Sequence, residues 1–204
     1  MPLIRESYYK TVRSRYDYSK PTPTLVTSNC VGGGVIYNDL GLQFTSPTVN
    51  LWFHENHFLK FATNFERYKN VPLRFVQNER GNYPKGQIDD IDIYFLHYKT
   101  ADEAERKWSE RYQRVDFSNT YIILNDMELE PQDYEMFHQL KCKRKIMFTT
   151  NPQHANWDDF FYIKNYEPNS YVRKHTVKRM NGHYDFELFF DYVAWINGDT
   201  EFTL

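Results

Sequence analysis

The chain has 204 residues with a formal net charge of −2 and 18% aromatic residues, which is enough for a single domain with a full hydrophobic core. The near-neutral charge argues against nucleic acid or an anionic membrane as a partner of the whole protein. No apolar run reaches the roughly 20 residues of a membrane-spanning helix, and the N-terminus lacks the apolar core of a signal peptide. Two cysteines, Cys30 and Cys142, are too few for a disulfide framework, so we expect a reduced, cytoplasmic protein.

The sequence pattern divides the chain into three segments. Residues 1–20 are expected to form a basic, tyrosine-bearing arm or helix that ends before Pro21. This arm either packs over the domain or makes a peripheral contact with a membrane or an assembly complex. Residues 21–166 are expected to form an α/β core, and residues 167–204 a C-terminal extension with a helix that packs on this core.

The elements expected in the core alternate between strands and helices. Hydrophobic spacing and capping signals predict both kinds of element. The expected strands are 25–27, 49–53, 71–76, 91–96, 120–124, 145–150 and 160–163. The expected helices are 35–40, 54–68, 100–114, one beginning at Pro131, and 185–196. From Ile91 onward the order is typical of a mostly parallel sheet. We therefore expect an α/β fold with three layers, in which helices cover both faces of that sheet.

Polar residues follow three of these expected strands. Cys30 comes after the first strand, His97 and Tyr98 after the strand at Ile91, and Asn125 after the next. Because the carboxyl ends of parallel strands meet at one edge of a sheet, these groups converge there. A thiol beside an imidazole is the minimum for a cysteine nucleophile with a general base. The alternative is a buried, inert cysteine in a plain strand-to-helix connection.

Other residues could assist the chemistry at this edge. The amides of Gly32, Gly33 and Gly34 could face an oxyanion or a phosphate, and Asp126 or Asp90 could orient the imidazole. His54 and His57 have metal-binding spacing, but a third ligand is missing nearby, so surface histidines are the preferred interpretation and no metal site is expected. The acidic group Asp89, Asp90 and Asp92 is interpreted as a solvated strand entry, with a metal site for a nucleotide sugar as the alternative.

The sequence also resembles a bacterial family over residues 25–166. The residues that carry the resemblance are Ser28-Asn29-Cys30 with the glycines that follow, Ile36-Tyr37, Leu40-Gly41, Ser46-Pro47-Thr48, Asp90-Ile91, Phe95–Tyr98, Lys107-Trp108 and Arg111. Members of this family occur among exopolysaccharide and capsule biosynthesis genes and are often labelled exopolysaccharide biosynthesis proteins or acetyltransferases. One departure is Val31, where the family usually has a tryptophan or a similarly large residue.

The resemblance and the Cys–His pair together predict an acyltransferase that moves an acetyl group from coenzyme A to a sugar or polysaccharide precursor. Cys30 would be the nucleophile or line the donor site, His97 the general base and Asn125 a polar positioning group. Tyr37, Tyr98 and Trp108 would stack on sugar or adenine. Ser28, Asn29, Ser46, Lys107 and Arg111 complete the expected binding residues.

Two alternatives remain open from the sequence. A nucleotide-sugar glycosyltransferase would bind a divalent metal at Asp90 or Asp92 and would not need Cys30. A non-catalytic component of polysaccharide assembly would dock through its N-terminal arm or its aromatic surface. The sequence predicts no covalently bound cofactor and leaves the oligomeric state open.

Overall fold

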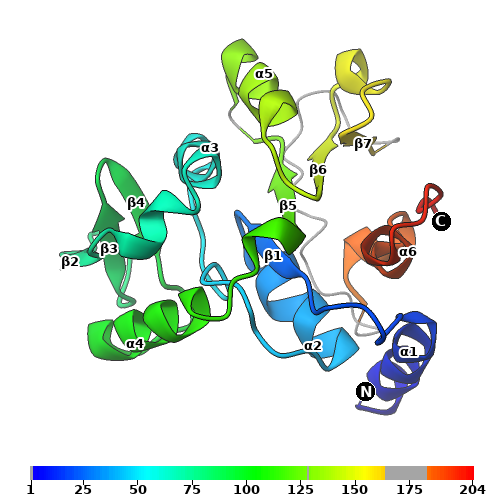
Figure 1. Ribbon diagram of the computed structural model, residues 1–204, viewed down its shortest axis with the longest axis horizontal. Coiled ribbons are helices and arrows are strands. Elements are labelled where there is room, and N and C mark those ends of the chain that lie inside the picture. The colour runs from blue at the N-terminus through cyan, green and yellow to red at the C-terminus, as the bar shows by residue number, and fades with distance from the viewer. Residues whose placement is uncertain (1, 128, 164–182) are drawn as a thin grey trace.

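The computed structural model describes residues 2–127, 129–163 and 183–204, which form two sheets and the helices around them (Figure 1). The larger sheet has four parallel strands in the order β1-β5-β6-β7, with bounds β1 Thr24–Thr27, β5 Thr120–Asn125, β6 Arg144–Thr149 and β7 Phe160–Tyr162. The smaller sheet is antiparallel, in the order β2-β3-β4, with bounds β2 Arg74–Val76, β3 Lys85–Ile88 and β4 Ile91–Tyr94.

The α/β class and a parallel sheet are confirmed, but the fold is not purely three-layered and parallel, because a second, antiparallel sheet is present. The strand expected at residues 91–96 ends at Tyr94 and belongs to the antiparallel sheet. The small sheet packs on a core that it shares with the larger sheet. This core buries the apolar side chains of Ile91, Ile93 and Phe95. An apolar run alone does not distinguish these two kinds of buried strand.

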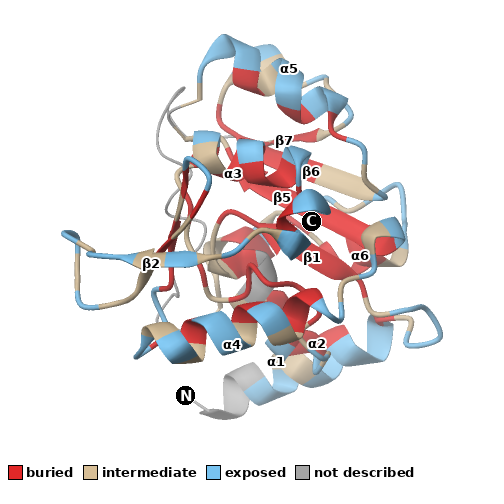
Figure 2. Cartoon of the chain, turned by 60° about the vertical axis from the view of Figure 1, so that its left-hand side comes forward, coloured by how far each residue is buried: buried red, intermediate tan, exposed pale blue. Residues whose placement is uncertain are grey.

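Alternate residues of the parallel strands point into two cores, as the period of two in a strand requires. One core receives Val26, Ile122, Leu124 and Met147 and continues into α3 (Glu55–Thr63), α4 (Ala101–Tyr112), α5 (Pro131–Gln139) and the antiparallel sheet. The other receives Leu25, Tyr121, Ile123, Ile146 and Phe148 and is covered by α1 (Pro2–Arg15), α2 (Tyr37–Leu40) and α6 (Tyr192–Asn197). Figure 2 shows the parallel strands as the buried centre of the molecule, with exposed residues along the outer helices.

Three expected elements differ from the structure for local reasons. Asn50 has a positive φ of 62°, so the strand expected at residues 49–53 is reduced to one bridge between Trp52 and Tyr94. The helix expected at residues 54–68 ends at Thr63, since the Asn64 side chain donates to the Lys60 carbonyl, and a 3₁₀ turn follows at Arg67–Asn70. Asp191 caps the Ala194 amide and starts a new helix, which divides the predicted helix 185–196 into a 3₁₀ turn at Asp185–Leu188 and α6.

Local capping signals explain the ends of two other helices. Gly41 ends α2 with a left-handed φ of 65°, and the Thr100 side chain accepts from the Glu103 amide at 3.1 Å at the start of α4. Short helical turns complete the described chain at Phe117–Asn119 and Pro152–His154.

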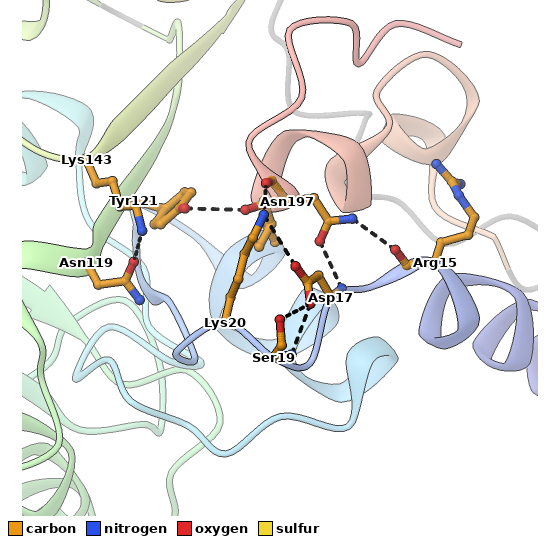
Figure 3. A network of polar contacts seen from close by, with 9 residues as sticks. Arg15, Asp17, Ser19, Lys20, Asn119, Tyr121, Lys143 and Asn197 are labelled. Carbon is orange, nitrogen blue, oxygen red and sulfur yellow. Dashed lines mark hydrogen bonds and ion pairs between the residues drawn. The ribbon is translucent and has the colours of Figure 1, made fainter.

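The segment after α1 is tied to the end of α6, as Figure 3 shows. The Asn197 side chain accepts from the Asp17 amide at 3.1 Å and donates to the Arg15 carbonyl at 2.9 Å, while Lys20 Nζ donates to the Asn197 carbonyl at 2.6 Å. The predicted arm and the predicted C-terminal helix therefore lie together on one face of the parallel sheet; residues 164–182 of the expected core end and extension lie outside the described residues. No helix in the described chain has both the length and the apolar character needed to cross a membrane.

Candidate functional site

A cavity of about 490 Å³ lies where the parallel sheet, the antiparallel sheet and the segment between them meet. Asn125 is the last residue of β5, Asn29 and Cys30 follow β1, and Leu96 follows β4. The full lining consists of Asn29, Cys30, Leu51, Trp52, Glu55, Arg80, Tyr83, Leu96, Asn125 and Met127. The carboxyl edge of an open α/β sheet is where such folds usually bind ligands.

The structure brings His97 next to Cys30, which lines this cavity; His97 itself is not among the lining residues. Cys30 Sγ lies 3.5 Å from His97 Nε2, within reach for a hydrogen bond to sulfur. Cys30 is half-buried just before the π-helix η1 (Val31–Ile36), and His97 is exposed three residues after β4. Within the described residues no side chain is hydrogen-bonded to the other ring nitrogen of His97, so the expected orienting carboxylate is not found there.

Burial raises the pKa of the Cys30 thiol from 9.0 to about 11. Desolvation disfavours the charged thiolate, so Cys30 is a protonated thiol at neutral pH. A protonated thiol is a weak nucleophile until a base removes its proton. The neighbouring His97 nitrogen is placed to accept that proton.

The turn that carries Cys30 is held by its neighbours. The Thr27 hydroxyl donates to the Asn29 carbonyl at 2.6 Å, and the Asn29 side chain accepts from the Val31 amide at 2.9 Å. The Phe53 amide donates to the Ser28 carbonyl at 3.0 Å. Asn29 and Ser28, both predicted as binding residues, therefore fix the position of the thiol.

Two buried oxygens at the same sheet edge lack partners. Ser28 is 1% exposed and Asn125 is 2% exposed, and neither Ser28 Oγ nor Asn125 Oδ1 has a hydrogen-bond partner among the described residues. Buried polar atoms are normally satisfied. Asn125 belongs to the cavity lining, although its Oδ1 atom is itself buried.

The three predicted glycines lie inside η1. At Gly34 a side chain would be crowded, since a Cβ atom there would lie 2.6 Å from Asn50 Oδ1. Gly34 thus permits a close approach to the turn at Asn50. The structure gives this packing reason for Gly34, and the anion-binding role of the three amides stays a prediction.

Several predicted binding residues are placed elsewhere. The rings expected to stack on ligand are buried: Tyr37 is fully buried, with its hydroxyl bonded to the Leu25 amide and the Pro23 carbonyl, and Tyr98 and Trp108 are core residues. The stacking expectation is therefore corrected, because these faces are covered by protein. Ser46 is buried beside Thr48.

The two predicted cations on α4 are also outside the cavity lining. Lys107 pairs with Glu110 at 3.5 Å on the helix surface. Arg111 is 6% exposed and donates to the Val49 carbonyl at 3.1 Å and to the Tyr98 hydroxyl. Arg111 and Tyr98 therefore attach the turn at Val49 to α4.

The acidic residues and His57, which were considered for metal binding, form ion pairs or hydrogen bonds within the protein. Arg67 pairs with Asp89 at 2.9 Å, Lys85 with Asp92 at 2.8 Å, and Lys60 with Asp90. The His57 Nδ1 atom accepts from the Asp92 amide at 2.9 Å. In the described ranges, no three His, Cys, Asp or Glu side chains are arranged to hold a metal ion.

Sequence reasoning missed much of the cavity lining. Trp52 and Glu55 follow the Asn50 turn, and Arg80 and Tyr83 lie in the loop between β2 and β3. These residues are far apart in the chain and follow no motif. The one available signal was the charged and aromatic content of a glycine-containing loop beside an apolar strand, since binding residues concentrate on loops.

Fold and site together define an α/β protein with a thiol–imidazole pair beside a cavity at the edge of its parallel sheet. The chain belongs to the family described as Domain of unknown function (DUF1919), whose model matches residues 4–197. It is 36% identical over 176 residues to a Haemophilus influenzae protein named "Uncharacterized protein", with 85% of this chain and 84% of that protein covered. The family match spans both sheets and the helices from α1 to α6.

Proposed function

We propose that this protein is a thiol-dependent acyltransferase of exopolysaccharide biosynthesis, which moves an acetyl group from coenzyme A to a sugar hydroxyl. The observation that carries the proposal is the 3.5 Å approach of Cys30 Sγ to His97 Nε2 at the cavity. The resemblance to exopolysaccharide biosynthesis proteins supports the sugar as acceptor.

The first half-reaction loads Cys30. His97 Nε2 accepts the thiol proton as Sγ attacks the thioester carbonyl of the donor, and a new carbon–sulfur bond forms. The carbon–sulfur bond to coenzyme A then breaks, and the proton on His97 passes to the departing thiolate. The raised pKa of Cys30 makes this base essential, because almost no thiolate exists at neutral pH without it.

The second half-reaction transfers the acetyl group. A sugar hydroxyl gives its proton to His97 and attacks the Cys30 thioester, and the Cys30 sulfur leaves and takes that proton back. Trp52 and Tyr83 line the cavity and offer rings against which a sugar can pack, and Glu55 and Asn125 are polar residues of the same lining.

The test uses labelled acetyl-coenzyme A and mass spectrometry of the intact protein. The wild-type protein should gain one acetyl group, released by hydroxylamine. Cys30→Ala should abolish the label and His97→Gln should slow labelling by about 10²- to 10⁴-fold, the usual contribution of a general base. Cys142→Ala is the matched control, because Cys142 is also a half-buried thiol with a pKa of about 11 but lies elsewhere.

The variants must keep the fold for the result to count, so each is first compared with the wild type by thermal unfolding. Label and turnover that persist in a folded Cys30→Ala protein would overturn the proposal. Acetyl transfer is then measured with a panel of free and nucleotide-linked sugars to find the acceptor.

A further inference from the structure

Arg80 is a cation at the cavity without an acidic partner. Its guanidinium carbon lies 5.9 Å from the centre of the Trp52 ring and 5.7 Å from that of the Tyr94 ring. Across the described ranges of the chain no carboxylate lies within ion-pairing distance of Arg80, although Lys60, Arg67 and Lys85 nearby are each paired. Arg80 therefore keeps its capacity to bind an anion.

The loop around Arg80 is held in place. The Asn78 side chain accepts from the Arg80 amide at 3.0 Å and donates to the Tyr83 carbonyl at 2.8 Å. A Cβ atom at Gly81 would lie 2.6 Å from the Tyr83 ring, so a side chain there would force this ring to move. Together with the two rings beneath it, this loop limits the freedom of the guanidinium, so an anion bound there costs less ordering of the side chain.

The residues that line the cavity range from buried to exposed. Asn125 is 2% exposed, whereas Arg80 is exposed and therefore lies at the lip of the cavity. Cys30 belongs to the same lining and is half-buried. A ligand that reacts at Cys30 and fills the cavity places its outer part beside Arg80.

We infer that the ligand of this cavity carries a phosphate, which Arg80 binds at the lip while the reacting end of the ligand lies at Cys30. Arginine binds phosphate through two parallel hydrogen bonds, which is the chemistry that a clamped, unpaired guanidinium provides. The inference rests on the proposed function for the reacting end. Two sources share this chemistry: the phosphates of coenzyme A and the pyrophosphate of a nucleotide-linked sugar acceptor.

The experiment compares each phosphorylated ligand with its phosphate-free counterpart by titration calorimetry. The pairs are coenzyme A with pantetheine and UDP-glucose with glucose. The proteins are the wild type, Arg80→Gln, Arg80→Lys and the control Arg74→Gln, an exposed arginine on the same sheet but outside the cavity. Thermal unfolding confirms that each variant is folded.

We expect Arg80→Gln to weaken binding of one phosphorylated ligand about 10- to 100-fold, as for a lost charge-assisted hydrogen bond, with an intermediate loss in Arg80→Lys. Arg74→Gln should bind like the wild type. If Arg80→Gln weakens the binding of coenzyme A, the donor is the source of the phosphate. If it weakens the binding of UDP-glucose, the acceptor is the source. Equal binding by the wild type and Arg80→Gln, or no preference for either phosphorylated ligand, would overturn the inference.

The same proteins separate this inference from the proposed function. If binding depends on Arg80 but labelling does not depend on Cys30, the phosphate site stands and the thiol mechanism fails. If labelling depends on Cys30 while Arg80→Gln binds normally, the thiol mechanism stands and the phosphate site fails.

Discussion

Trp52 and Tyr94 exchange two backbone hydrogen bonds, each amide donating to the carbonyl oxygen of the other residue at 2.9 Å. The next residue, Phe53, donates to the Ser28 carbonyl at the end of β1. This short segment therefore joins the end of the antiparallel sheet to the end of the parallel sheet. His97 and Cys30 follow these two attachment points by a few residues, which is why they meet.

Alkylation of Cys30 should accelerate steadily with pH. In a Cys142→Ala background, the rate with iodoacetamide should rise about tenfold per pH unit between about pH 7 and pH 9, because the thiolate fraction grows in that proportion below a pKa of about 11. Stopped aliquots analysed by mass spectrometry give the rate. A plateau near neutral pH would contradict the prediction and indicate a preformed thiolate–imidazolium pair.

The folded protein should lose stability as the pH rises from about 9 to about 11. Burial raises the pKa of both Cys30 and Cys142 from 9.0 to about 11, so the unfolded chain releases these protons first and is favoured over this range. Tyr16 and Tyr37, with pKa values raised to about 12, act in the same direction at higher pH.

Urea unfolding at pH 8, 9 and 10 measures this effect. The double variant Cys30→Ala/Cys142→Ala should show a smaller loss of unfolding free energy between pH 9 and pH 10 than the wild type. An equal loss in both proteins would rule out the thiols as the cause.

Asn197→Ala should lower the free energy of unfolding by about 1–3 kcal/mol, since it removes side-chain hydrogen bonds to the Asp17 amide and the Arg15 carbonyl. Urea unfolding at neutral pH provides the value. The control Gln132→Ala changes an exposed residue of α5 and should shift stability by less than about 0.5 kcal/mol. Similar values for the two variants would mean that the contact between the arm and α6 adds no stability.

Thr100→Ala should destabilise the protein by about 1 kcal/mol, because the amide at the start of α4 loses the side-chain oxygen that caps it. Thr100→Ser keeps a hydroxyl at the same place and should retain most of the stability. The comparison is again made by urea unfolding, and a serine variant as unstable as the alanine variant would show that the cap is not responsible.

The local elements could be predicted from the sequence because their signals are local. Pro131, Thr100 and Gly41 mark ends of helices through their own backbone chemistry, and the structure confirms each. The pairing of Ile91–Tyr94 could not be predicted, since strand partners depend on contacts distant in the chain. A buried apolar strand looks the same in a parallel and in an antiparallel sheet.

The site shows the same division. The predicted proximity of Cys30 and His97 is observed, but by a route across two sheets that the sequence did not indicate. Tyr37 and Trp108 were expected to stack on a ligand, but they fill the core. The aromatic residues that line the cavity are Trp52 and Tyr83. Residue type cannot separate a ring that packs in a core from one that binds a ligand.

The burial that keeps the Cys30 thiol protonated also slows its reaction with oxidants. Peroxides attack thiolates, and a thiol with a pKa of about 11 presents almost none at neutral pH. The protein should therefore tolerate peroxide levels that inactivate enzymes with preformed thiolates. Covalent inhibitors directed at Cys30 would need to bind the cavity first and bring their electrophile within reach of His97.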